Sequence, residues 1–302
     1  MTALLESPAA GDVLTRPMPT RPLGPFPWEA SVVTLGGVKW DTLCSDAEAV
    51  ELVHRAVELG INTFDTAHGY GDGESERKLG LALEGMRRRV WINTKTLDRT
   101  YDGARRQVEV SLQRLRTDYV DLLFVHSLDS DDHRRQILAA ESVLKALEEY
   151  RDAGHIRHIG ISGHWVRDVM ARIIQEYPFE AVLCPCGLFN AAYDYSFMDT
   201  VAPVARSRGM AVLGMKVMGA GRVKHARRRE PYIRYALHQP IDTAVIGVDS
   251  ISQLEEIVQV AKSHPEPLTE HEVRDLCPEA LEITRTFDGL EFNWVEPYRK
   301  RA

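Results

Sequence analysis

Three ionisable side chains occur where short apolar segments of the chain end, and a tyrosine follows the first of them. Asp65 closes one such segment, Lys95 lies at the end of the next, and His126 closes the one after that. Tyr70 follows Asp65 in the stretch FDTAHGYGDGESE, where three glycines give the backbone unusual freedom. A carboxylate, an amine, an imidazole and a phenol are groups that general acid–base catalysis uses. These four residues are therefore the candidate catalytic set.

Together, these side chains suit the delivery of a proton to a carbonyl oxygen. A tyrosine phenol has an ordinary pKa of about 10, so it is a useful donor near neutral pH only when its anion is stabilised. The ammonium group of Lys95 would stabilise the anion, and the carboxylate of Asp65 would keep that ammonium charged. His126 would hydrogen-bond the substrate oxygen. No side chain supplies a hydride, so a nicotinamide cofactor is expected.

Each of the four residues also has an ordinary structural explanation. Asp65 would cap a turn, and Lys95 would extend to solvent. His126 would be a hydrogen-bonded core side chain, and Tyr70 would anchor its loop. Their equivalent places at the ends of neighbouring segments favour a shared catalytic role over four separate coincidences.

Eight short segments rich in β-branched residues alternate with helical patterns. The segments are continuously apolar, which is typical of strands covered on both faces. Alternating strands and helices predict a parallel sheet, and eight such units favour a closed (β/α)8 TIM barrel over an open doubly wound sheet. No Gly-x-Gly-x-x-Gly follows the first segment, which argues against a Rossmann fold. The segments are residues 31–37, 61–65, 90–95, 119–126, 156–162, 180–184, 210–216 and 242–247.

The barrel prediction explains how the four residues would meet. In such a barrel all strands present their carboxyl ends at one face, where the active site lies. The second, third and fourth segments would deliver Asp65, Lys95 and His126 to that face. Residues 1–22, rich in Pro, Thr and Ala, predict a flexible N-terminal tail, and residues 23–302 are expected to form a single barrel domain.

The composition is that of an ordinary globular protein, with 302 residues and a formal net charge of -7. The acidic balance argues against a nucleic-acid partner. The N-terminal sequence lacks the basic start and apolar core of a secretory leader, and no apolar run is long enough to span a bilayer. A cytoplasmic protein without a membrane partner is therefore expected. Four scattered cysteines form no paired ligand motif, so no metal site is predicted.

Motifs along the chain resemble those of the aldo/keto reductase superfamily. FDTAHGYGDGESERKLGLAL resembles its Asp-Thr-Ala…Tyr-Gly…Ser-Glu…Leu-Gly signature, and INTKT and VDLLFVH fit its lysine and histidine strands. HIGISG resembles its nicotinamide-binding strand, and DTAVIGVDSISQLEE its last strand and cofactor loop. The resemblance covers the chain from about Leu23 to residue 286. It implies a barrel with an N-terminal β-hairpin and an extra C-terminal helix, and an NAD(P)H-dependent oxidoreductase that reduces an aldehyde or ketone to an alcohol, or the reverse.

The resemblance also implies a role for each candidate residue. Tyr70 would be the general acid, and Lys95 and Asp65 would lower its pKa. His126 would bind and polarise the carbonyl group, and Ser162 would hold the nicotinamide carboxamide. The other expected cofactor-binding residues are Met215, Lys216, Gly247, Asp249, Ser250, Gln253 and Glu256. The expected pocket walls are Trp40, His68, Trp165, the loop 127–132 and the C-terminal stretch 290–301.

The expected cofactor site departs from the family pattern in several places. Gly163 stands where an asparagine is usual, and Met215 where an aromatic residue often stacks on the nicotinamide. Lys216 replaces a phosphate-binding serine and would pair with the pyrophosphate instead. Asp249 stands where a serine often binds the 2′-phosphate of NADPH, and a carboxylate suits a ribose hydroxyl better than a phosphate. The family favours NADP(H), so we expect a weak NADPH preference, dual use, or a preference for NAD(H).

Two other functions stay open from the sequence. A nucleotide-binding regulatory subunit would keep the fold and turn over slowly, which the altered carboxamide contacts favour slightly. A lyase would form a Schiff base through Lys95, but that reading leaves Tyr70 without a role. The physiological substrate, the direction of the reaction and the oligomeric state are not readable from the sequence.

Overall fold

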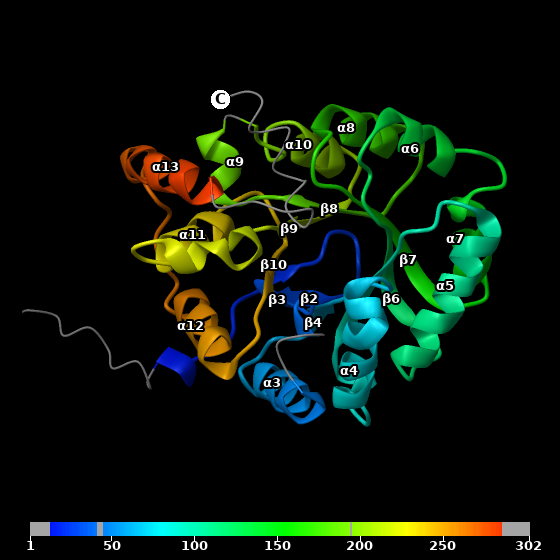
Figure 1. Cartoon of the computed structure of the whole chain (residues 1–302), viewed down its shortest axis with the longest axis horizontal. Helices are drawn as coiled ribbons and strands as arrows, with labels where there is room; N and C mark the ends of the chain where they lie inside the picture. Colours follow the sequence, from blue (N-terminus) through cyan, green and yellow to red (C-terminus); the bar gives the residue numbers. More distant parts are fainter. Residues whose placement is uncertain (1–12, 41–44, 194, 286–302) are drawn as a thin grey trace, which may run out of the picture.

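Eight parallel strands close into a barrel in the computed structural model, which describes residues 13–40, 45–193 and 195–285 (Figure 1). Each strand pairs with the next along the chain, and β10 closes the ring by pairing with β3. The predicted (β/α)8 barrel is confirmed. The strands are β3 (Val33–Gly36), β4 (Thr63–Asp65), β5 (Trp91–Thr96), β6 (Val120–Val125), β7 (Ile156–Ser162), β8 (Ala181–Pro185), β9 (Ala211–Met215) and β10 (Thr243–Gly247).

Helices surround the barrel (Figure 1). Ser45 begins α3 with a capping box, in which its side chain accepts from the Glu48 backbone and the Glu48 carboxylate accepts from the Ser45 backbone. The helices that follow the barrel strands are α3 (Asp46–Glu58), α4 (Glu74–Ala82), α5 (Tyr101–Arg114), α7 (Val143–Asp152), α8 (Arg167–Glu176), α10 (Val201–Ser207), α11 (Glu230–Leu237) and α12 (Ile251–Lys262). Shorter or additional elements are η1 (Tyr70–Gly73), η2 (Arg87–Arg89), α6 (Asp131–Ile137), α9 (Leu188–Ala192), η3 (Gly219–His225) and α13 (Glu270–Thr284).

A β-hairpin closes the amino ends of the barrel strands. β1 (Thr20–Pro22) pairs antiparallel with β2 (Glu29–Ser31). Between them, the Phe26 ring packs 5.2 Å from the Trp91 ring and 4.1 Å from the His158 ring, near the starts of β5 and β7. The hairpin therefore covers the opposite end of the barrel from Asp65, which is the last residue of β4.

The folded chain extends further toward the N-terminus than the expected boundary at Leu23. β1 begins at Thr20, and the side chains of Val13 and Met18 are buried. Met18 packs where Gly60 ends α3, because a Cβ on Gly60 would approach the Met18 Cβ within 2.8 Å. These buried apolar side chains explain why the Pro- and Thr-rich composition did not predict where the folded chain begins. Residues 1–12 lie outside the described residues.

The expected extra helix at the C-terminal end is α13, which packs against α9. Thr269 and Glu272 form a capping box at its start. Near its end, the hydroxyl groups of Thr284 and Tyr193 hydrogen-bond at 2.5 Å. The stretch 290–301, expected to line the pocket, lies outside the described residues.

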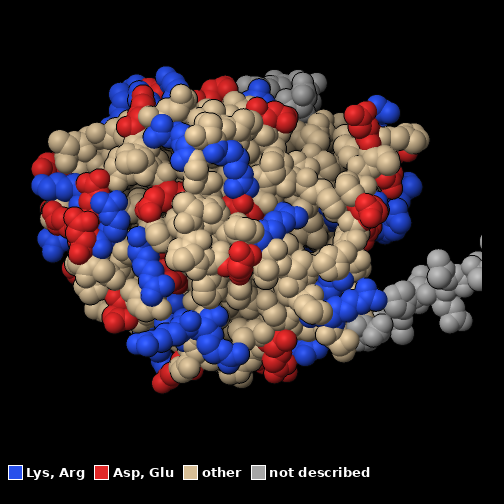
Figure 2. All heavy atoms as spheres, turned by 180° about the vertical axis from the view of Figure 1, so that it is seen from behind, with Lys and Arg blue, Asp and Glu red and all other residues tan. Residues whose placement is uncertain are grey.

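Charged side chains of both signs are mixed on the surface. Figure 2 shows Lys and Arg interspersed with Asp and Glu across one face of the described chain. This pattern differs from the extended basic face that a nucleic-acid phosphate backbone requires. No helix among the described residues has both the length and the apolar character needed to cross a bilayer.

Candidate active site

Asp65 and Lys95 form a buried ion pair at the carboxyl ends of β4 and β5. Asp65 pairs in register with Asn93, so Lys95 lies two residues further along β5 and on the same face as Asn93. The Lys95 ammonium group donates to the Asp65 carboxylate and, at 2.6 Å, to the Thr66 carbonyl oxygen. The Lys95 and Asp65 side chains are only 2% and 4% exposed. The pair is therefore shielded from solvent and held rigidly.

The surroundings of Lys95 favour its charged form. Burial alone lowers the pKa of the Lys95 amine, but the Asp65 carboxylate and the Tyr70 phenol outweigh burial and raise that pKa above its ordinary value. Schiff-base formation requires a neutral amine, which a lowered pKa would favour. The charge state of Lys95 therefore argues against the lyase alternative.

Tyr70 lies next to both Lys95 and His126 at the barrel mouth. The Lys95 nitrogen is 4.7 Å from the centroid of the Tyr70 ring. The rings of Tyr70 and His126 meet edge to face, with centroids 5.8 Å apart. The Tyr70 backbone N–H donates to the Ala67 carbonyl oxygen at 3.1 Å, which turns the chain back over the end of β4. The structure thus brings together the four residues of the candidate catalytic set.

Burial raises the pKa of the Tyr70 phenol above its ordinary value, and the two charged neighbours act on it in opposite directions. Lys95 lowers the pKa of Tyr70, as expected, whereas the negative charge of Asp65 raises it. The prediction that Asp65 lowers the pKa of Tyr70 is therefore wrong for its direct effect. Asp65 instead contributes by holding Lys95 charged and in place.

Two histidines at the mouth are held in their neutral form. Burial lowers the pKa of His126 well below its ordinary value, and the charges of Lys95, Lys216 and Arg99 lower it further. Burial has the same effect on the pKa of His164, which the charge of Lys216 lowers as well. A neutral imidazole keeps one N–H donor and one acceptor. His126 can therefore donate a hydrogen bond to a substrate oxygen at neutral pH.

Three residues that act electrostatically at the mouth were not predicted: His164, Lys39 and Arg99. Each lies two or three positions beyond the last residue of a barrel strand, after β7, β3 and β5 respectively. The signal that identified Asp65 and His126 was position at a strand end. Applying the same rule to the residues just beyond each strand would have found all three.

Lys216 directly follows β9 and has a φ of +62°, which is uncommon for a residue other than glycine. Burial, together with the charges of Lys95 and Lys39, lowers the pKa of Lys216 to about 8. After burial, the remaining part of this lowering reflects three amino groups that share one mouth. Such a mouth favours an anionic ligand, and the phosphates of a dinucleotide have that charge.

The Ser162 hydroxyl, predicted to hold the nicotinamide carboxamide, already has two hydrogen-bond partners within the barrel. The Ser162 hydroxyl donates to the Val125 carbonyl oxygen at 3.4 Å and accepts from the Ser127 backbone N–H at 3.3 Å. The residue is 1% exposed. Ser162 therefore ties the end of β7 to the end of β6. Met215 is also buried, at 7% exposure, at the end of β9.

Gly163 has no space for the asparagine that the family pattern places there. A Cβ at Gly163 would lie 2.8 Å from the Leu128 carbonyl oxygen and 2.6 Å from the Met170 side chain. The loop after β6 therefore packs directly on this glycine. The next polar side chain along the chain is His164, whose neutral imidazole can donate and accept hydrogen bonds.

The loop from β10 into α12 contains the remaining predicted cofactor-binding residues. Gly247 is the exposed last residue of β10. Ser250 caps α12 by accepting from the Gln253 backbone N–H at 3.4 Å. The Asp249 backbone N–H in turn donates to the Gln253 side-chain oxygen at 3.4 Å. These polar side chains stabilise the loop itself, which orders it before any ligand binds.

Glu256, also predicted to bind the cofactor, forms an ion pair with Arg229. The Arg229 guanidinium lies 2.5 Å from the Glu256 carboxylate. Arg229 precedes α11, so it is remote in sequence from α12, beside which it lies. This placement supplies a cation next to α12 that the local sequence lacks before Lys262.

Two of the predicted pocket walls have other roles. Trp40 is 1% exposed, and its indole N–H donates to the Val248 carbonyl oxygen at 2.9 Å, so it is a core side chain. His68 turns toward α5, where its Nδ1 lies 3.3 Å from the Ser111 hydroxyl oxygen. Long-range packing, rather than closeness to a strand end, sets the direction of these side chains. Trp165 remains half-buried after β7.

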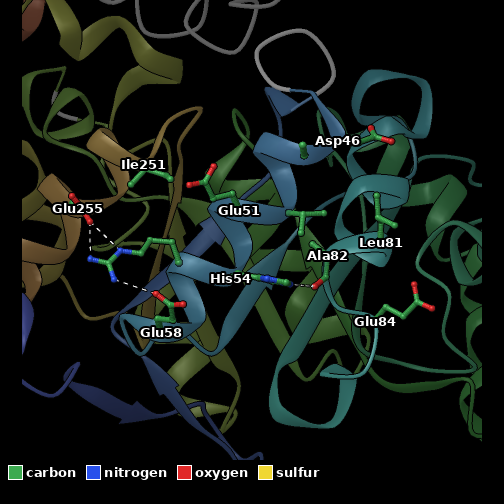
Figure 3. Close-up of a pocket in the computed structure, with 12 residues that line it drawn as sticks. Asp46, Glu51, His54, Glu58, Leu81, Ala82, Glu84, Ile251 and Glu255 are labelled. Carbon is green, nitrogen blue, oxygen red and sulfur yellow. Dashed lines mark hydrogen bonds and ion pairs between the residues drawn. The ribbon is translucent and has the colours of Figure 1, made fainter.

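A large hollow elsewhere on the molecule lies away from the four candidate residues. This groove of about 850 Å³ runs between α3, α4 and α12, outside the barrel (Figure 3). Within it, the Arg55 guanidinium pairs with Glu255 at 2.7 Å and with Glu58 at 3.2 Å, and the His54 Nε2 lies 2.9 Å from the Ala82 carbonyl oxygen. Its side chains are thus largely engaged with one another, and size alone is a poor guide to the active site here.

Comparisons with known proteins agree with this geometry. A model of the "Aldo/keto reductase family" matches residues 32–234. The "uncharacterized oxidoreductase YqkF" of Bacillus subtilis is 28% identical over 307 residues, which cover 86% of this chain and 95% of that relative. The "aldo-keto reductase YhdN" of the same organism is 31% identical over 191 residues, which cover 59% of this chain and 54% of that protein.

A solved structure shares the fold. The holo form of an aldo-keto reductase from Bacillus halodurans, AKR11C1, superimposes with a TM-score of 0.72 at 23% identity. The match covers 87% of this chain and 96% of that one. This likeness supports the architecture, including the closed barrel.

Proposed function

Because this chain belongs to the aldo/keto reductase family, it is an oxidoreductase, and we propose that it interconverts a small carbonyl compound and its alcohol, using NAD(P)(H) and Tyr70 as the proton donor. The convergence of Tyr70, Lys95 and His126 at the barrel mouth is the observation that carries this proposal. A phenol beside a buried ammonium group and a neutral imidazole is suited to protonating an oxygen atom that gains negative charge.

The direction of proton transfer follows from the charge states of these residues. When bound, a nicotinamide supplies the hydride for the carbonyl carbon. The C=O electron pair moves onto oxygen, and Tyr70 donates its proton to that oxygen. The products are an alcohol and a phenolate, which the Lys95 ammonium group stabilises until solvent returns the proton. His126 would donate its N–H to the same oxygen and stabilise the charge that develops there.

The residues at the mouth fit an anionic dinucleotide. Lys216, after β9, and Lys39, after β3, would hold the pyrophosphate, because two neighbouring positive charges attract an anion. The loop between Gly247 and Gln253 would hold the adenosine portion, and its internal hydrogen bonds would lower the entropic cost of binding. His164 would contact the carboxamide beside the Ser162 hydroxyl, which already donates to the Val125 carbonyl oxygen and accepts from the Ser127 backbone N–H.

A nucleotide-binding regulatory subunit is the second candidate, and the engaged Ser162 favours it. A loosely held nicotinamide would bind but react slowly. The two candidates differ in one measurable property, which is turnover relative to binding.

A substrate panel tests the proposal. Purified protein is titrated with NADPH and NADH by fluorescence, and oxidation of each nucleotide is then followed with aliphatic and aromatic aldehydes, ketones and 2-oxo acids. Catalytic turnover with at least one carbonyl class supports the enzyme. Tight nucleotide binding with no multiple turnover across the panel would favour the regulatory subunit, and no nucleotide binding would refute both candidates.

A further inference from the structure

The loop that carries Tyr70 has an unusual backbone. After Tyr70, residues Gly71, Asp72 and Gly73 have φ values of +57°, +51° and +97°. Asp72 is not glycine, and L-residues rarely adopt this left-handed region. Residues in such conformations persist when surrounding contacts hold them there. The source of those contacts therefore decides how firmly Tyr70 is placed.

Arg114, the last residue of α5, supplies these contacts. Its Nη1 donates to the His68 carbonyl oxygen at 3.0 Å, and its Nη2 donates to the Asp72 carbonyl oxygen at 3.0 Å. The two accepting residues flank Tyr70, two positions before it and two after it. One planar guanidinium group thus fixes both ends of the segment whose middle residue is the proposed proton donor.

A buried carboxylate lies beside the guanidinium group of Arg114. Glu76 is 0% exposed, and its Oε2 lies 3.5 Å from the Arg114 Nη1. The other Glu76 oxygen accepts from the Thr94 hydroxyl at 2.6 Å, and Thr94 immediately precedes Lys95 in β5. The same set of contacts therefore links α5 to the Tyr70 loop and to the strand that carries Lys95.

Two glycines make room for Arg114. Gly73 and Gly80 are seven residues apart, at the start of α4 and two turns further along the same side. A Cβ at Gly73 would collide with the Arg114 guanidinium group, and a Cβ at Gly80 would collide with the Arg114 carbonyl oxygen. The end of α5 is thus seated directly against the backbone of α4.

We propose that Arg114 is a positioning residue for Tyr70, and that its clamp on the His68 and Asp72 carbonyls sets the phenol against Lys95 and His126. This inference rests on the proposed function, because it assigns Arg114 a role in proton donation. Arg114 touches neither Tyr70's hydroxyl nor the reacting atoms in any contact that the structure records, so it acts through the loop. Small displacements of a reacting group are costly, of the order of 10²-fold for about 1 Å.

The kinetic test uses Arg114→Met, with Arg116→Met as a matched control. Arg116 lies two residues further along, and its ion pair with Glu84 at 3.0 Å is exposed to solvent. We expect Arg114→Met to lower kcat roughly 10- to 100-fold with the Kd for the nucleotide unchanged, and the control to stay within about twofold of wild type. Arg114→Lys keeps the cation but loses the two-pronged contact, so its kcat should lie between those of Arg114→Met and the control. If Arg114→Met does not fold, Arg114→Lys replaces it in the test.

A double-mutant cycle separates positioning from a general loss of structure. If Arg114 acts through Tyr70, Arg114→Met in a Tyr70→Phe background should lower the residual turnover by no more than about threefold. The reason is that the effects of residues that act as a unit are strongly non-additive. The same 10- to 100-fold loss in both backgrounds would overturn the proposal.

Hydrogen exchange tests the clamp without requiring turnover. The amides of residues 68–73 should exchange faster in Arg114→Met than in wild type, with no change in Arg116→Met. Unchanged exchange in that loop would overturn the proposal whatever the activity. If the loop exchanges faster in Arg114→Met but the wild-type protein turns over no carbonyl compound, the clamp is supported and the proposed function is refuted.

Discussion

Tyr70 and His126 meet edge to face at the barrel mouth, with ring centroids 5.8 Å apart and planes at 78°. Tyr70 follows β4 and His126 follows β6, so the strand between them, β5, places Lys95 next to both. The His126 backbone N–H donates to the Thr96 carbonyl oxygen at 2.9 Å, which continues the strand pairing to the mouth. Barrel register thus places His126 beside Lys95, and the loop after β4 brings Tyr70 against both.

Replacing the phenol should remove most of the carbonyl turnover. Tyr70→Phe should lower kcat by roughly 10²–10⁴-fold, because the acid that protonates the carbonyl oxygen is lost. The affinity for the nucleotide should stay nearly unchanged, as measured by fluorescence titration. Tyr150→Phe is the matched control, since Tyr150 hydrogen-bonds Glu109 at 2.6 Å on the outside of the barrel. Turnover of Tyr70→Phe equal to that of wild type would remove Tyr70 from the role.

Removing the cation beside the phenol should shift the pH profile. Lys95 lowers the pKa of Tyr70 against the raising effect of burial, so Lys95→Met should raise it further. In the oxidation direction Tyr70 must be deprotonated, and the rising limb of activity should move to higher pH. In the reduction direction, the loss of activity at high pH should also move upward. Profiles of wild type and Lys95→Met that superimpose would contradict the charge argument.

Binding of the nucleotide should weaken as pH rises through about 8, the pKa of Lys216 in the free protein. Below that pH, Lys216 carries the charge that would attract a phosphate, and above it the charge is lost. Lys216→Met should flatten this dependence and weaken binding roughly 10-fold at neutral pH. Lys224→Met, at an exposed position nearby in the chain, is the control. A Kd that does not change with pH in wild type would exclude Lys216 from phosphate binding.

The choice between NADPH and NADH should depend on Asp249. A carboxylate accepts from a ribose 2′-hydroxyl but repels a 2′-phosphate. Asp249→Ser should therefore shift the ratio of kcat/KM values toward NADPH by an amount on the order of 1 kcal/mol. An unchanged ratio in a protein that already prefers NADPH strongly would show that Asp249 does not contact the 2′ position.

The cation beside α12 should act in the opposite direction. Arg229 lies next to α12, which follows the loop predicted to bind the cofactor, through its ion pair with Glu256 at 2.5 Å. Arg229→Gln should shift the ratio of kcat/KM values toward NADH, because a positive charge near the 2′-phosphate is removed. Equal losses with both nucleotides would assign Arg229 a structural role instead.

The sequence by itself determined the barrel and three of the residues at its mouth. Continuous apolar segments between helical patterns predict covered parallel strands, and chain order then puts Asp65, Lys95 and His126 on neighbouring strands. All three lie in or directly after a strand, where the two-residue period and the common strand direction decide which way a side chain points. The local sequence pattern was sufficient for these three residues, because the direction of their side chains is set within each strand.

Only the tertiary structure decided the loop and surface contacts. Trp40 and His68 were expected in the pocket, but packing against Val248 and Ser111 turns them elsewhere. The neutral state of His164 depends on its burial in the folded chain and then on the charges of Lys216 and Lys95, which come from other parts of the barrel.

Long-range pairing explains what the sequence could not show. Arg114 reaches the Tyr70 loop across 42 positions of the chain, and Arg229 reaches Glu256 across 27. A loop has no repeating period that sets the direction of its side chains. Their directions follow from whichever distant surface the fold brings against them, and that surface exists only once the barrel has closed.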